Sequence, residues 1–138
     1  MPLIDLLARN AQERGDSTFL VVENRVHSFL AIHDAALRFA TLLQIVGAQP
    51  GQHVALVAEN SAAFIVAWFG ISAAGCVAVT LNTQSMGEGL RYALTHSDAT
   101  IIVADAAWFE AKLTRGTALA ELPRISIHSD PEIGRAHV

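Results

Sequence analysis

The stretch His53–Asn82 reads HVALVAENSAAFIVAWFGISAAGCVAVTLN, and it decides the fold. It contains an apolar run at His53–Ala58, a helical segment at Ala62–Ala74 that is apolar almost all round, and a second β-type run at Cys76–Leu81. We predict a strand, a helix and a strand. Neither strand alternates polar with apolar residues, so we expect both to be covered on two faces, as in a parallel sheet. Such a crossover is right-handed in nearly all known cases.

A membrane span is the alternative interpretation of this stretch. Ala62–Val79 holds 18 residues with one hydroxyl and no charge, which is the nominal length for a span. However, Gly70 and Gly75 interrupt the run, its last third favours strand, and no basic cluster marks a cytoplasmic flank. A buried crossover helix of an α/β protein is therefore preferred, and no transmembrane segment is expected.

The residues before this stretch predict two helices with a hairpin between them. Pro2–Arg14 forms an amphipathic helix pattern whose apolar face contains Leu3, Leu6, Leu7 and Ala11. Two short β-type runs, Thr18–Val22 and Arg25–Phe29, could form a hairpin around Glu23-Asn24. Phe29–Val46 is the clearest helix, with Ser28 as N-cap and Gly47 at the C′ position. Its expected apolar face comprises Leu30, Ile32, Ala36, Leu37, Phe39, Ala40 and Leu43.

The residues after Asn82 continue the alternation of helix and strand. Either Asn60 or Ser61 is placed to cap the central helix. Beyond the polar loop Thr83–Gly87 we predict helices and strands in turn, at Glu88–His96, Thr100–Val103, Ala106–Leu113 and Leu122–His128. The expected fold class is α/β, a doubly wound parallel-type sheet with covering helices.

Composition excludes several classes of function. The 138 residues are 52% hydrophobic and 16% charged, with a net charge of −4, so no basic surface for nucleic acid is expected. The single cysteine, Cys76, rules out an internal disulfide and fits a reducing compartment, which favours the cytoplasm. The N-terminus lacks the pattern of a signal peptide.

The residues alone indicate no active site. The six histidines lack metal-ligand spacing, and Cys76 lies in an apolar run that disfavours its thiolate. Gly87-Glu88-Gly89 follows a strand and opens a helix, as a dinucleotide loop would, but Tyr92 stands where the third small residue belongs. Asp105 could bind a ligand at a strand end, although a cap for the helix at Ala106–Leu113 is the simpler explanation. We therefore assign no catalytic, cofactor-binding or metal residue.

The last seven residues, Glu132–Val138, have no periodicity. Their sequence EIGRAHV can be reverse-translated into a common short-read sequencing adapter, whose next codon in that frame is a stop. We expect residues 132–138 to be a non-native tail and residues 1–131 to be the native part of a truncated domain. A natural terminus is the alternative.

An ordered set of junction residues resembles the acyl-adenylate-forming, or AMP-binding, enzymes, above all the acyl-CoA synthetases. The similarity covers about residues 3–130. It runs through Pro50-Gly51-Gln52-His53, Glu59-Asn60-Ser61, Trp68-Phe69-Gly70, Gly75–Asn82 and Ser97–Val103. Gln52 stands where the family usually has Asp, and Thr80 where it usually has Pro.

The resemblance implies what a full-length parent would do. A carboxylic acid would react with ATP and Mg²⁺ to form an acyl-adenylate, and coenzyme A would then take the acyl group. The family's phosphate loop, ribose-binding acid and catalytic lysine would lie downstream, so we expect this chain to be inactive alone and prone to self-association. Trp68-Phe69-Gly70 resembles synthetases of fatty or carnitine-type acids. Alternatives are another adenylating enzyme, such as a peptide-synthetase adenylation domain, or a non-catalytic α/β binding module.

Overall fold

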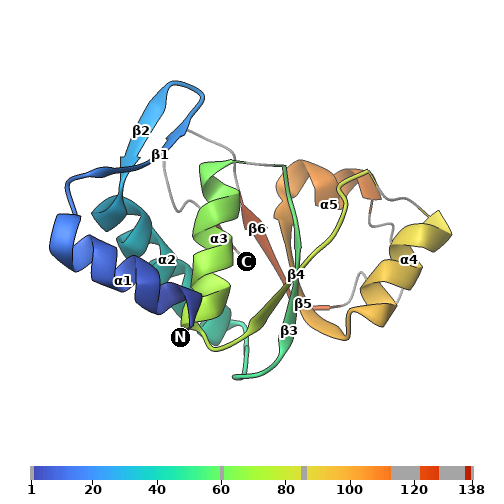
Figure 1. The fold of residues 1–138 in the computed structure, drawn as a ribbon. Helices are drawn as coiled ribbons and strands as arrows, with labels where there is room; N and C mark the ends of the chain where they lie inside the picture. Colours follow the sequence, from blue (N-terminus) through green and yellow to red (C-terminus); the bar gives the residue numbers. More distant parts are fainter. Residues whose placement is uncertain (1, 60, 85–86, 113–121, 128–135, 138) are drawn as a thin grey trace.

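A computed structural model describes residues 2–59, 61–84, 87–112, 122–127 and 136–137. Five helices and seven strands alternate along them (Figure 1). In chain order they are α1 (Leu3–Arg14), β1 (Thr18–Val22), β2 (Arg25–Ser28), α2 (Phe29–Ile45), β3 (His53–Val57), α3 (Ala62–Ala73), β4 (Val77–Thr80), α4 (Gly87–His96), β5 (Ala99–Asp105), α5 (Ala106–Lys112), β6 (Arg124–Ile127) and β7 (Ala136–His137). The predicted alternation of helix and strand is confirmed.

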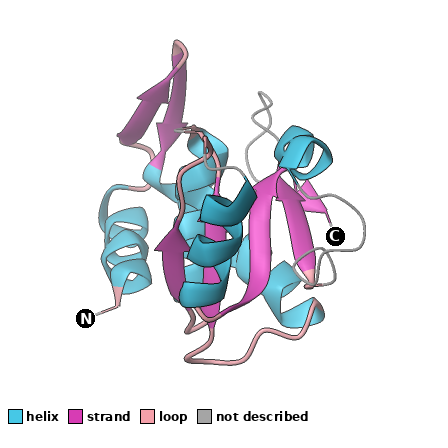
Figure 2. Ribbon diagram, turned by 90° about the vertical axis from the view of Figure 1, so that its right-hand side faces the viewer, coloured by secondary structure: helices cyan, strands magenta, loops and turns pink. Residues whose placement is uncertain are grey.

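The main sheet has the strand order β4-β3-β5-β6-β7. The first four strands are parallel, and β7 pairs antiparallel with β6. Helices lie on both sides of these strands (Figure 2), with α1, α2 and α3 on one side and α4 and α5 on the other (Figure 1). The predicted doubly wound α/β architecture is therefore confirmed.

Alternate residues of the central strands supply two separate hydrophobic clusters. On the face of α1 to α3, Val54 and Leu56 pack with residues such as Phe39, Leu43 and Ile71. On the opposite face, the cluster joins α4 and α5 to the sheet, and it contains Ala55, Val57, Ile102, Ala104, Leu90, Leu94, Trp108 and Phe109. Both faces of β3 and β5 are covered, which explains why these strands read as continuous apolar runs.

The unit β3-α3-β4 has the predicted order, but the prediction that both strands are covered on two faces is wrong for β4. That strand lies at the edge of the sheet, and Val77 is 47% exposed. On the other face, Ala78 packs against the first cluster. The apolar character of β4 therefore does not reflect full burial.

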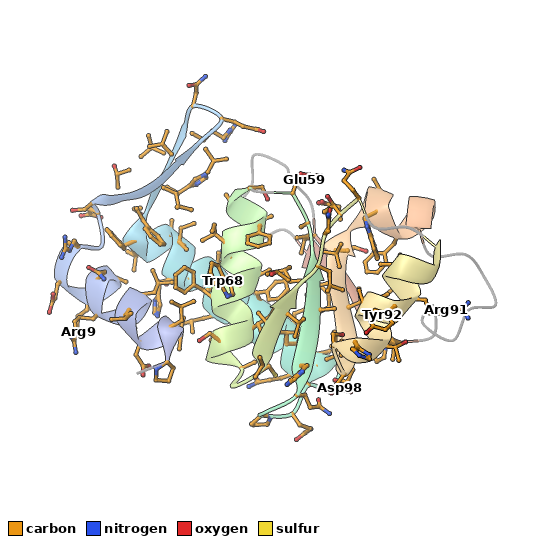
Figure 3. All side chains as sticks on the ribbon, turned by 45° about the vertical axis from the view of Figure 1, so that its right-hand side comes forward. Arg9, Glu59, Trp68, Arg91, Tyr92 and Asp98 are labelled. Carbon is orange, nitrogen blue, oxygen red and sulfur yellow. The ribbon has the colours of Figure 1, made fainter. Side chains whose placement is uncertain are left out.

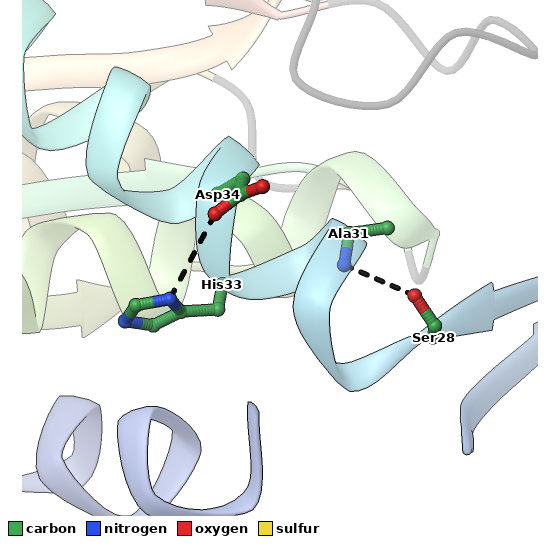
Figure 4. Close-up of polar contacts among 4 residues, drawn as sticks. All are labelled: Ser28, Ala31, His33 and Asp34. Atoms are coloured by element: carbon green, nitrogen blue, oxygen red, sulfur yellow. Dashed lines mark hydrogen bonds and ion pairs between the residues drawn. The ribbon is translucent and has the colours of Figure 1, made fainter. Parts of the chain in front are cut away.

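The N-terminal residues form the predicted hairpin, which projects from the body of the molecule (Figure 1). Its turn residues Glu23 and Asn24 both have positive φ angles, of 50° and 64°, as a type I′ turn requires. The Ser28 hydroxyl then accepts a hydrogen bond of 3.1 Å from the backbone N–H of Ala31 at the start of α2 (Figure 4). In the same view, His33 Nδ1 lies 4.0 Å from the Asp34 carboxylate.

Three leucines expected on buried helix faces are instead exposed. Leu6 is 47% exposed, and Leu30 and Leu37 are both 44% exposed. The buried residues of α2 are Ile32, Ala35, Ala36, Phe39, Ala40 and Leu43. Periodicity alone therefore predicted an apolar face on each helix that is wider than the face that is buried.

The last described residues, Ala136–His137, fall within the segment expected to be a non-native tail, and they pair with Ser126 and Ile127 of β6. Within the described residues, no helix combines the length and the apolar character that a membrane crossing needs.

Candidate ligand-binding cleft

A cleft of about 450 Å³ lies where β3 and β4 end and α3 begins. In open parallel sheets, ligands bind at the carboxyl ends of the strands, so this position is the usual one for a site. The lining residues come from α3, from β4 and from the segments that follow β3 and β4; they are Ala58, Glu59, Phe64, Trp68, Thr80, Leu81, Asn82 and Thr83.

The aromatic wall of the cleft comes from one face of α3. The helix begins where the Ser61 hydroxyl accepts a hydrogen bond of 3.1 Å from the backbone N–H of Phe64. Phe64 and Trp68 are one turn apart, and their rings meet edge to face with centroids 6.2 Å apart. Trp68 is 42% exposed, whereas its neighbour Phe69 is buried. The indole is free to contact a ligand.

The polar wall joins the segments that follow β3 and β4. The Thr83 hydroxyl donates a hydrogen bond of 2.9 Å to the Glu59 carboxylate. The side-chain oxygen of Asn82 accepts one of 2.8 Å from the backbone N–H of Gln84, which fixes the local turn. This hydrogen bond from Thr83 orients the Glu59 carboxylate, and Glu59 remains exposed to solvent.

The charge of the cleft limits what it can bind. Among the described residues that line it, Glu59 is the one charged group, and none is Lys, Arg or His. A carboxylate repels phosphate and carboxylate groups at close range. The described part of the cleft therefore lacks the cations with which proteins hold a polyphosphate.

The glycines considered for phosphate binding do not form a tight loop. Gly87 is the first residue of α4, and Gly89 lies in its first turn. A Cβ atom added to Gly89 would meet no atom within 4 Å, so no close approach of backbone or ligand calls for glycine there. Asp105 ends β5, and it is not among the residues that line the cleft.

Cys76 lies at the opposite end of β4 from the cleft. Its sulfur donates to the Gln49 carbonyl oxygen at 3.4 Å, and burial raises the pKa of the thiol. A raised pKa lowers the thiolate fraction, so the position disfavours nucleophilic chemistry.

The described histidines His53 and His96 make separate contacts in different parts of the fold. His53 Nδ1 lies 2.7 Å from the Ser97 carbonyl oxygen, whereas the ring of His96 stacks on Tyr92 with centroids 4.2 Å apart. Within residues 2–59, 61–84, 87–112, 122–127 and 136–137, no three His, Cys, Asp or Glu side chains are placed to share a metal ion.

The cleft was missed from the sequence. Glu59 and Thr83 are 24 residues apart, and no motif joins them. A usable signal did exist, because residues just beyond two parallel strands meet at one edge of the sheet. Applied to the ends of the two predicted strands, this rule would have selected Glu59 and Asn82, the residue next to Thr83.

Comparison with known proteins gives one consistent family. The family model described as AMP-binding enzyme matches residues 7–135. The crotonobetaine/carnitine–CoA ligase of Salmonella paratyphi A is 30% identical over 104 residues, which are 72% of this chain and 20% of that protein. The chain thus spans about a fifth of the length of the curated relatives it matches.

Solved structures agree with this match. The benzoate CoA ligase of Burkholderia xenovorans LB400 superposes with a TM-score of 0.73 and 28% identity, over 80% of this chain and 22% of that one. The O-succinylbenzoate coenzyme A synthetase of Bacillus subtilis, in complex with AMP, gives a TM-score of 0.78 at 21% identity, over 91% of this chain and 31% of that one. At 21% identity, the similarity to the Bacillus subtilis synthetase shows a shared fold alone.

Proposed function

The chain belongs to the AMP-binding enzyme family, and on that premise we propose that it is the N-terminal part of the large domain of an ATP-dependent acyl-CoA synthetase. The family match over residues 7–135 carries the proposal. The similarity to two CoA ligases, one from sequence and one at 28% identity from structure, supports it.

The proposed reaction of the parent has two steps. A carboxylate oxygen of the substrate attacks the α-phosphorus of ATP, which forms an acyl-adenylate and releases pyrophosphate, with Mg²⁺ offsetting the phosphate charge. The thiol sulfur of coenzyme A then attacks the acyl carbonyl carbon, and AMP leaves as the thioester forms. The substrate is a carboxylic acid, and fatty or carnitine-type acids are the favoured class.

The role proposed for this chain is structural. Its parallel sheet and covering helices form a rigid layer, and the described cleft residues lack the cations that ATP would require. ATP, Mg²⁺ and coenzyme A would therefore be bound by residues elsewhere in the parent. A scaffold that fixes reacting groups contributes to catalysis by positioning them.

We further propose that residues 1–131 are native and that residues 132–138 are not. The family match extends to residue 135 and so overlaps the start of the proposed tail. The match therefore does not locate the boundary, and the DNA sequence is the test. The proposal requires the adapter codons GAG ATC GGA AGA GCA CAC GTC across these seven positions. Any other codons there would overturn it. A cytoplasmic location for the parent rests on the single cysteine.

Carboxylate-dependent exchange of pyrophosphate into ATP tests the function. The purified 138-residue chain should give no exchange above a protein-free control with benzoate, carnitine or a fatty acid. The full-length parent, expressed from its native gene, should give exchange that requires both Mg²⁺ and a carboxylic acid. A parent without such exchange would contradict the proposed activity, and an active 138-residue chain would contradict the structural role.

A further inference from the structure

The cleft has two chemically different walls, and together they define a ligand. Phe64, Trp68 and Leu81 give it an apolar and aromatic side, while Glu59 gives it one carboxylate. In Figure 3, Trp68 lies midway along α3 and Glu59 lies beyond the end of β3, so the two walls are separated. A ligand that used both would need an apolar body and a polar group at one end.

The polar end must suit Glu59. A carboxylate accepts hydrogen bonds, and it favours a cation over a neutral donor. The hydrogen bond from Thr83 holds this carboxylate in place, so less side-chain entropy is lost when a ligand binds. No described lining residue is basic, so no cation of the cleft itself competes for Glu59.

The apolar body must suit the aromatic wall. Trp68 is 42% exposed. Covering a large indole face with a flat or aliphatic group removes apolar surface from water, which is favourable in free energy. The edge-to-face contact with Phe64 holds the indole against α3. A volume of about 450 Å³ is within the range of small-molecule sites.

We propose that this cleft binds amphipathic organic amines, with the aromatic or aliphatic body on Phe64 and Trp68 and the ammonium group on Glu59. The inference does not depend on the adenylation chemistry, because it uses neither ATP nor a carboxylic acid. The ammonium group, and not a carboxylate, is the part of the ligand that Glu59 would recognise.

The test is an NMR titration of the ¹⁵N-labelled 138-residue chain with phenylbutylammonium. The chain has two tryptophans, and the signal of buried Trp108 serves as an internal reference, assigned with W108F. The Trp68 indole signal and the Glu59 and Thr83 amide signals should shift, while the Trp108 indole signal should stay. Phenylbutanol should bind more weakly, and phenylpentanoate, of similar size but negative charge, more weakly still.

Two charge-matched variants separate a local contact from a change in overall charge. E59Q should weaken phenylbutylammonium binding by about two- to fivefold, the range of an exposed ion pair, and should leave phenylbutanol binding unchanged. E13Q, which removes an exposed carboxylate on α1, should leave both unchanged. Three outcomes would overturn the inference: shifts confined to residues outside the cleft, phenylpentanoate binding as tightly as the amine, or equal affinities for E59Q and E13Q.

Discussion

Phe39 of α2 packs directly on Gly70 of α3. A Cβ atom at position 70 would lie 2.7 Å from Phe39 Cδ1 and 3.0 Å from the Ala36 carbonyl oxygen. Protein interiors have no spare volume for such an atom. The two helices that cover one face of the sheet can therefore approach this closely because residue 70 has no side chain.

Gly70→Ala should destabilise the chain by about 1–3 kcal/mol, the usual cost of overpacking a core. The clash outweighs the better helix propensity of alanine. Urea unfolding followed by circular dichroism measures the change. Gly89→Ala is the matched control, because its Cβ would enter open space inside α4, and it should stabilise the chain by up to about 1 kcal/mol. Equal effects of the two substitutions would refute this account of α2–α3 packing.

Ser61→Ala should remove the N-cap of α3 and lower the free energy of unfolding by about 0.5–2 kcal/mol. The hydroxyl accepts the hydrogen bond from the Phe64 N–H, and alanine leaves that donor without its partner. Ser61→Asp should restore most of the stability, since aspartate is an equally good cap. A loss in Ser61→Asp as large as in Ser61→Ala would mean that the serine acts by another route.

Stability should fall as the pH drops below about 6.5 because of His27. This side chain is 6% exposed, and burial, with a smaller effect of the nearby Arg25 charge, lowers its pKa from the ordinary value of 6.5. The unfolded chain then binds a proton more readily than the folded chain does. The stability that neutral His27 contributes is therefore fully present above pH 6.5. It is lost as the pH falls from 6.5 through the lower pKa of His27 in the folded chain.

His27→Phe should reduce this acid-dependent loss, measured as urea stability at pH 7.5 and pH 5. His96→Gln, at an exposed position on α4, is the control and should keep the wild-type difference. An unchanged pH dependence in His27→Phe would exclude His27 as its source.

The outer face of α2 should promote self-association. Leu30 and Leu37 are each 44% exposed, and Ile45 is 72% exposed; exposed apolar surface of this kind favours contact with other molecules. Sedimentation velocity should detect species larger than a monomer, and Leu37→Lys with Ile45→Lys should shift the distribution toward monomer. A wild-type chain that sediments as a monomer at all concentrations would contradict this prediction.

Local signals were sufficient to predict the helices and strands up to β6. The caps at Ser28 and Ser61, the turn at Glu23-Asn24 and the continuous apolar run of β3 all depend on residues close in sequence, so the pattern there specifies the structure. The antiparallel hairpin is formed without the favoured Asn-Gly pair, because Glu23 and Asn24 both adopt positive φ angles.

Properties that depend on strand order could not be predicted in this way. The residues of β4 are as apolar as those of β3, yet β4 lies at the edge of the sheet. The exposure of Val77 follows from that position. The cleft depends on the same relationship, because Glu59 and Thr83 meet only when β3 and β4 lie side by side.

The native gene beyond the codon for Pro131 offers the most direct measurement of the central claim. If this chain is the first layer of an adenylate-forming enzyme, sequencing that locus should reveal, in frame, a loop rich in serine, threonine and glycine with a lysine. A locus whose reading frame contains no such loop would contradict the claim.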